Sequence, residues 1–184
     1  EDVSSQQNHG TSVFSILAGF EEGKIVGPAF NASFILAKTE YVPSETHVEE
    51  DNYAAALEWM DSIGVDITTS SLGYSVFDKT DFSYTYEDMD GKTTIVTKAA
   101  ELAFEKGITV ITSAGNEGNS VANDSTYWYY ISAPGDGFNT LTIGAVPRSN
   151  TIASFSSRGP TYDGRIKPEV VAQGVSVFNA NAGN

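Results

Sequence analysis

Residues 108–118 read Ile-Thr-Val-Ile-Thr-Ser-Ala-Gly-Asn-Glu-Gly. The first six are mostly apolar or β-branched, which predicts a short buried strand. Gly115 and Gly118 follow closely, and glycine permits backbone angles and close approaches that other residues do not. The stretch therefore predicts a strand that ends in a tight turn, with Asn116 in that turn.

On both sides of this strand, helix-like and strand-like patterns alternate. Apolar residues at helical spacing predict helices over 9–19, 51–63 and 93–106, and glycine closes each of them. Compact apolar or β-branched runs predict strands over 33–39, 65–71, 108–113 and 141–146, with shorter candidates at 170–171 and 175–178. Such alternation requires crossover connections, so we predict one α/β domain with a largely parallel sheet that is covered on both faces. Residues 74–92 form the main irregular stretch, a surface loop or partly a hairpin turning at Asp90-Gly91.

The composition excludes several classes of function. The 184 residues include 24 acidic and 10 Lys or Arg side chains, a net charge of −14, so neither a nucleic acid nor an anionic membrane surface is an expected partner. There is no cysteine, which excludes a disulfide framework, a cysteine zinc site and a thiol nucleophile. No apolar run approaches the roughly 18 residues of a membrane span, so membrane insertion is not expected.

Polar residues gather where chemistry is expected in a parallel sheet, at the carboxyl ends of strands. Asn116 follows one strand, and its amide could donate a hydrogen bond to a developing oxyanion or simply cap an ordinary turn. His9 stands at the start of a predicted helix, where it is either a rigidly held base or a structural histidine. His47 lies in a Glu-rich stretch, where a surface or structural role is expected.

Other known catalytic and ligand-binding motifs do not match this sequence when they are compared with it residue by residue. The nucleophile elbow Gly-x-Ser-x-Gly does not occur. Residues 19–24 lack the Ser or Thr of a phosphate loop, and residues 135–140 lack the third glycine of a dinucleotide loop. Residues 88–91 look like the centre of a calcium loop, but Tyr86 and Thr97 stand where acidic ligands belong. No metal site is predicted.

Six short motifs occur one after another along the chain. They are Asn8-His9-Gly10-Thr11, Gly27-Pro28-Ala29-Phe30-Asn31-Ala32, Ser70-Ser71-Leu72-Gly73, Ser113-Ala114-Gly115-Asn116-Glu117-Gly118, Ala153-Ser154-Phe155-Ser156-Ser157-Arg158-Gly159-Pro160 and Lys167-Pro168-Glu169-Val170-Val171-Ala172. In this order, and over most of the chain, they resemble the subtilisin-like serine protease family.

The resemblance implies a three-layer doubly wound α/β fold with a mainly parallel sheet and an Asp/His/Ser triad. His9 matches the general base, and Asn116 matches the side-chain donor of the oxyanion hole. The backbone segments that flank the substrate match Ser71, Leu72, Gly73, Ala114 and Gly115. The walls of the pocket for the side chain before the cut fall within 71–74 and 130–135.

The family's other two triad residues find no match here. The family's Asp lies in an Asp-Thr/Ser-Gly segment before the histidine, whereas Asp2 is followed by Val3-Ser4. The family's Gly-Thr-Ser segment is not found before Asn184. We therefore expect residues 1–184 to be a partial catalytic domain, incomplete at both ends and inactive alone, because His9 would lack both its carboxylate and a serine to activate.

Two functions remain open at this point. The parent protein is expected to be a serine endopeptidase acting on peptide or protein substrates; the alternative is a non-catalytic peptide- or partner-binding domain on the same scaffold. The resemblance further implies secretion or a cell-envelope location and allows structural calcium, without assigning a calcium site or an oligomeric state.

Overall fold

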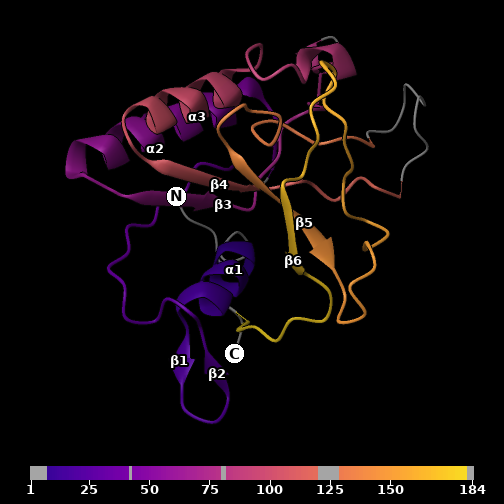
Figure 1. The fold of residues 1–184 in the computed structure, drawn as a ribbon. Coiled ribbons are helices and arrows are strands. Elements are labelled where there is room, and N and C mark those ends of the chain that lie inside the picture. The colour runs from indigo at the N-terminus through magenta and orange to yellow at the C-terminus, as the bar shows by residue number, and fades with distance from the viewer. Residues whose placement is uncertain (1–7, 42, 80–81, 120–128, 182–184) are drawn as a thin grey trace. The chain divides into compact units, whose positions relative to one another are not determined.

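The computed structural model describes residues 8–41, 43–79, 82–119 and 129–181 (Figure 1). The chain divides into two compact units. One comprises residues 1–37 with 176–184, and the other comprises residues 38–175. Each unit has its own internal contacts.

The first unit consists of a helix and a short hairpin. Helix α1 (Asn8–Ala18) is followed by β1 (Phe20–Glu21) and β2 (Ile25–Val26), which pair antiparallel. The later segment of this unit is held to α1, because the N–H of Ala180 donates to Ser15 Oγ at 2.8 Å and Ser12 Oγ donates to the carbonyl of Ala180 at 3.1 Å. The helix predicted over 9–19 is confirmed.

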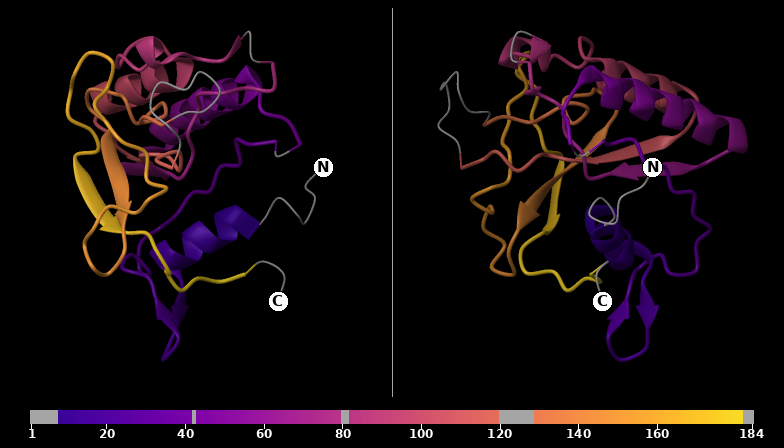
Figure 2. Two further views of the ribbon diagram at one scale, coloured as in Figure 1. Left: turned by 90° about the vertical axis from the view of Figure 1, so that its right-hand side faces the viewer. Right: turned by 180° about the vertical axis from the view of Figure 1, so that it is seen from behind.

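The second unit is built on a four-stranded parallel sheet in the order β3-β4-β5-β6. The strands are β3 (Ile67–Ser70), β4 (Thr109–Ser113), β5 (Leu141–Val146) and β6 (Val170–Gln173). Helix α2 (His47–Ile63) packs against α3 (Ile95–Glu105), and α3 packs against β4. Both views in Figure 2 show the two helices side by side over one face of this sheet. The predicted parallel α/β arrangement is confirmed.

The core lies between these helices and the sheet. Side chains alternate along β4, where Val110 and Thr112 are buried and Ile111 is only half-buried. The buried positions meet the apolar stripe of α3, which includes Val96 and Ala100. Burial of such side chains contributes about 25 cal/mol per Å² of apolar surface, so this layer is a main source of stability.

Helix α2 begins four residues before the predicted start at Asp51. The N–H and hydroxyl of Thr46 both donate to the Glu49 carboxylate, at 2.7 and 3.0 Å, which satisfies the polar groups at the start of the helix. The helix ends, as predicted, at Gly64, whose φ of 86° is left-handed.

Two predicted strands are wrong. Residues 33–39 form no strand, and Phe34 and Leu36 are exposed, because an apolar run becomes a strand only where a neighbour accepts its backbone hydrogen bonds. Residues 175–178 form no strand either. The candidate strand at 170–171 is confirmed and continues to Gln173 as β6. The other strands were predicted to within two residues, and β5 matches the predicted range.

The irregular stretch 74–92 is a loop that includes short helical turns and forms no hairpin among its described residues. It contains the 3₁₀ helix η3 (Tyr86–Asp88). The Asp90 carboxylate accepts hydrogen bonds from the N–H groups of Lys92 and Thr93, and Gly91 has a φ of 82°. The predicted turn at Asp90-Gly91 therefore leads into α3 instead of closing two strands.

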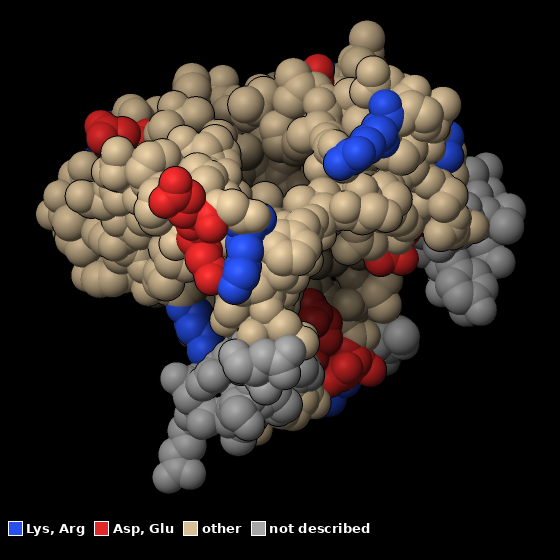
Figure 3. Space-filling model, turned by 90° about the horizontal axis from the view of Figure 1, so that it is seen from below, with Lys and Arg blue, Asp and Glu red and all other residues tan. Residues whose placement is uncertain are grey.

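Charged side chains are scattered over the described part of one face of the molecule (Figure 3). On the face drawn in Figure 3, the Lys and Arg side chains stand in separate places among acidic and other residues. The described part of this face therefore presents no continuous cationic strip of the kind that binds a polyanion.

None of the described helices has the length and apolarity needed to cross a membrane.

Candidate active site

The turn after β4 presents Asn116 to solvent. The N–H of Ala114 donates to the carbonyl of Ile143 at 2.9 Å, which continues the sheet by one residue. Gly115 then adopts a φ of 104°, a conformation that favours glycine, and the chain leaves the sheet. Asn116 is exposed, and no hydrogen bond joins its carboxamide to another described residue.

A second segment, Phe155-Ser156-Ser157, holds this turn. The carbonyl of Gly115 accepts from the N–H of Ser157 at 3.0 Å, and the N–H of Glu117 donates to Ser157 Oγ at 3.0 Å. The N–H of Gly118 donates to the carbonyl of Phe155 at 2.8 Å. The sequence supplied this segment only as part of a motif, and it gave no sign of the contact with the Asn116 turn.

The residues after β3 lie beside the same turn. Ser113 Oγ donates to the carbonyl of Leu72 at 3.2 Å, which ties this segment to the end of β4. Ser71 and Gly73 are exposed, and no hydrogen bond joins the main chain of Gly73 to other described residues. The structure therefore brings together six of the seven predicted site residues, namely Ser71, Leu72, Gly73, Ala114, Gly115 and Asn116.

Ser132 lies between these two segments. Tyr74 and Ala133 exchange two main-chain hydrogen bonds of 2.8 and 3.2 Å, so the chain around Ser132 runs past Gly73. A Cβ on Gly73 would lie 3.0 Å from Ser132 Cβ, and one on Gly115 would lie 3.0 Å from Ser132 Oγ. The sequence predicted a wall of the substrate pocket within residues 130–135, without identifying Ser132.

Asp136 anchors that wall to the helical layer. Its buried carboxylate accepts from the N–H of Gly91 at 2.8 Å and from Thr97 Oγ1 at 2.6 Å. Burial raises the pKa of Asp136, while these two hydrogen bonds act in the opposite direction. The segment that carries Ser132 is thus fixed at its far end.

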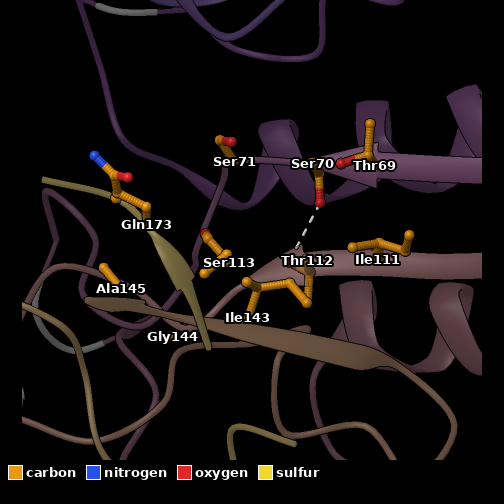
Figure 4. A pocket seen from close by; sticks show the side chains of 12 residues that line it. Thr69, Ser70, Ser71, Ile111, Thr112, Ser113, Ile143, Gly144, Ala145 and Gln173 are labelled. Atoms are coloured by element: carbon orange, nitrogen blue, oxygen red, sulfur yellow. Dashed lines mark hydrogen bonds between the residues drawn. The ribbon is translucent and has the colours of Figure 1, made fainter. Parts of the chain in front are cut away.

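An open hollow of about 270 Å³ lies across the carboxyl halves of the four strands (Figure 4). Its lining mixes apolar side chains such as Ile111 and Ile143 with hydroxyl groups, and Ser70 Oγ donates to Thr112 Oγ1 at 3.3 Å. Ser71 belongs to both the hollow and the predicted substrate segment, whereas Asn116 does not line the hollow. The hollow is therefore a neighbour of the site around Asn116 and not the site itself.

His9 belongs to the first unit. It lies in the first turn of α1, which begins at Asn8, and its side chain is exposed. The predicted position at a helix start is confirmed. The imidazole is accessible from solvent.

His47 has a structural role. One ring nitrogen, Nδ1, is bonded to the buried carboxylate of Glu50, and Nε2 is 2.9 Å from the carbonyl oxygen of Phe82. Burial acts to lower the pKa of His47, but these two hydrogen bonds and the nearby acidic charges raise it overall. Its ring also packs against Phe77 and Tyr84, so it is a packing residue of the second unit.

Within the described ranges, no group of three or more His, Asp or Glu side chains is arranged to hold a metal ion.

The family model described as "Subtilase family" matches residues 1–184. The chain belongs to the subtilase family. Its curated relatives include proteins named as serine proteases and subtilisin-like proteases.

This subtilase chain covers only part of the relatives it matches. It is 33% identical to Serine protease AprX of Bacillus subtilis (strain 168) over 127 residues, which are 65% of this chain and 25% of the relative. It is 34% identical to Subtilisin-like protease 2 of Trichophyton rubrum over 156 residues, 84% of this chain and 31% of the relative. The chain thus spans about a quarter to a third of these relatives.

Solved protease structures share the fold. The self-cleaved protease domain of PatA superposes with a TM-score of 0.71 at 20% identity and covers 95% of this chain and 57% of that one. The Staphylococcus aureus epidermin leader peptide processing serine protease (EpiP) gives a TM-score of 0.64 at 21% identity, covering 94% and 41%. The predicted three-layer doubly wound α/β fold class is confirmed by this likeness.

Proposed function

We propose that the full-length protein containing this chain is a serine-type endopeptidase that works through an Asp/His/Ser triad and an acyl-enzyme. In this proposal residues 1–184 are a partial catalytic domain that is inactive alone. His9 is the general base and Asn116 donates to the oxyanion. The triad aspartate and the nucleophilic serine come from other parts of the full-length protein.

The observation that carries this proposal is the exposed Asn116 carboxamide. It stands at the carboxyl end of a parallel strand, where ligands of such sheets bind, and no described residue occupies its hydrogen-bonding groups. A neutral hydrogen-bond donor that faces the developing oxyanion stabilises the negative charge in the transition state. A donor engaged within the protein could not serve in this way.

The proposed reaction divides peptide hydrolysis into two acyl transfers. The serine oxygen bonds to the scissile carbonyl carbon while His9 takes the serine proton, and Asn116 donates a hydrogen bond to the resulting oxyanion. The C–N bond then breaks, and the amine leaves with the proton from His9. Water attacks the ester by the same route and regenerates the serine.

The segment Ser71-Leu72-Gly73 suits the main chain of an extended peptide. Ser71 and Gly73 are exposed, and the main-chain N–H and carbonyl of Gly73 make no hydrogen bond with another described residue. A peptide strand laid along such an edge gains backbone hydrogen bonds whatever its sequence. We propose that Ser71, Leu72 and Gly73 hold one side of the substrate, and Ala114 and Gly115 the other.

A serine-directed phosphonate probe tests the proposal on the full-length protein. We expect covalent labelling of the wild type and its loss in His9→Ala, with a fall in kcat of about a million-fold, a scale known from subtilisin itself. The matched control is His47→Gln, which removes the other histidine and leaves labelling intact.

The alternative, a peptide- or partner-binding domain, predicts a different result. Binding of an extended peptide without labelling or hydrolysis would overturn the endopeptidase proposal and support this alternative. Secretion or a cell-envelope location and structural calcium also belong to the proposal, supported by the family resemblance alone. Export of the full-length protein and the effect of a chelator on its Tm test these two points.

A further inference from the structure

We propose that Ser157 is a positioning residue for the oxyanion hole, one that acts by holding the main chain on both sides of Asn116. This inference rests on the proposed function. It assigns a role to a residue that the sequence motifs left without one.

The geometry places Ser157 as a two-point clamp. Its N–H donates to the carbonyl of Gly115 at 3.0 Å, and its Oγ accepts from the N–H of Glu117 at 3.0 Å. These are the residues immediately before and after Asn116. Ser157 has an exposed fraction of 0%, so water does not compete for the hydroxyl.

The clamp matters because nothing else in the described chain holds the Asn116 side chain. The carboxamide is exposed and makes no hydrogen bond with another described residue. Its direction therefore depends on the backbone of residues 115–117. A misplacement of about 1 Å in a catalytic group costs on the order of 100-fold in rate, so a small shift of this turn is expected to lower kcat.

The clamp is itself attached to the sheet. The neighbouring Ser156 Oγ accepts from the N–H of Ala145 on β5 at 3.0 Å, and its exposed fraction is also 0%. A Cβ on Gly118 would lie 2.0 Å from the carbonyl oxygen of Ser156, so the two segments are in contact with no room between them. Residues 156 and 157 thus lie between β5 and the turn.

Ser156 provides a matched control for the experiment. Ser156→Ala and Ser157→Ala each remove one fully buried hydroxyl that accepts one main-chain N–H, but only the Ser157 hydroxyl is hydrogen-bonded to the turn that carries Asn116. Steady-state peptide hydrolysis by the full-length protein separates kcat from KM. For Ser157→Ala we expect kcat to fall about 10- to 100-fold with KM nearly unchanged. For Ser156→Ala we expect a change in kcat within about twofold.

A double variant separates positioning from general destabilisation. If Ser157 acts through Asn116, Ser157→Ala changes kcat by less than about twofold when Asn116 is already alanine, because coupled residues are not additive. Equal losses in Ser156→Ala and Ser157→Ala, a loss confined to KM, or full additivity with Asn116→Ala would each overturn the inference.

Two further outcomes are distinguishable. If the wild type hydrolyses no peptide and takes no phosphonate label, the proposed function fails and this inference with it. If the wild type is active and only Asn116→Ala is impaired, the inference alone fails. Should Ser157→Ala not fold, Ser157→Cys fills the same place with a somewhat larger thiol that accepts weakly, and it carries the same expectation for kcat.

Discussion

At the scale of single residues, the proposed chemistry depends on a side chain that contributes little to folding. Asn116 is exposed and makes no hydrogen bond to the rest of the described chain. Removing it should leave stability almost unchanged, since surface substitutions away from caps and buried networks usually stay within about 0.5 kcal/mol. A loss of activity on removal would therefore report on catalysis and not on folding.

We expect Asn116→Ala in the full-length protein to lower kcat by about 100- to 1,000-fold, a range that was measured on subtilisin itself. KM should change little, because the amide acts on charge that develops only in the transition state. Steady-state kinetics on a peptide substrate measure both constants. Asn119→Ala, at another exposed asparagine close by in the sequence, is the control. A kcat within a few-fold of wild type for Asn116→Ala would contradict the role.

At the scale of elements, the turn 114–118 is shaped by its contact with residues 155–157. Gly118 has no room for a side chain, because a Cβ would lie 2.0 Å from the carbonyl oxygen of Ser156. A backbone oxygen cannot move aside as a flexible side chain can. Gly107, which follows α3, has a φ of 97° but open space around it.

We therefore expect Gly118→Ala to destabilise the protein more than Gly107→Ala does. Gly107→Ala should cost roughly 1–2 kcal/mol from backbone strain alone, and Gly118→Ala about 3 kcal/mol or more from overlap with the main chain. Urea unfolding of the full-length protein in the His9→Ala background, which prevents autolysis under the proposed function, measures both. Equal midpoints would show that the turn can move away from residues 155–157.

At the scale of the whole molecule, acidic groups crowd the start of α2. Burial, followed by the charges of Glu40, Glu49 and Asp78, raises the pKa of Glu45 to about 7. A carboxyl with a raised folded pKa binds its proton more tightly in the folded state than in the unfolded state. Its contribution to stability is therefore present at low pH and is lost as the pH rises from about 4.5 to about 7.

We expect Glu45→Gln to raise the Tm at pH 8 and to leave it nearly unchanged at pH 5, because glutamine removes the charge that is unfavourable there. Thermal unfolding of the His9→Ala protein at the two pH values provides the measurement. Glu58→Gln, at an exposed position of α2, removes the same charge away from the cluster and should show a smaller difference. The same gain at both pH values would show that charge at Glu45 is not the cause.

The sequence by itself determined the fold class and supplied the residues of the proposed site. The alternation of helical and strand-like periodicity was sufficient for the parallel α/β arrangement and for β5, since burial on one face of an element leaves a local pattern. The start of α2 was missed because the Thr46–Glu49 cap lies outside the apolar stripe. The motif order was sufficient for the family, which the match over residues 1–184 then established.

Only the tertiary structure decided which backbone groups find partners and what holds the site in place. Residues 33–39 have the composition of a strand and are not one, whereas Ser157 and Ser132 have ordinary local surroundings in sequence and lie against the Asn116 turn and Gly73. A hydrogen bond such as that from the N–H of Glu117 to Ser157 Oγ, between residues 40 positions apart, leaves no periodic trace along the chain. It exists because the fold brings the two segments within about 3 Å of each other.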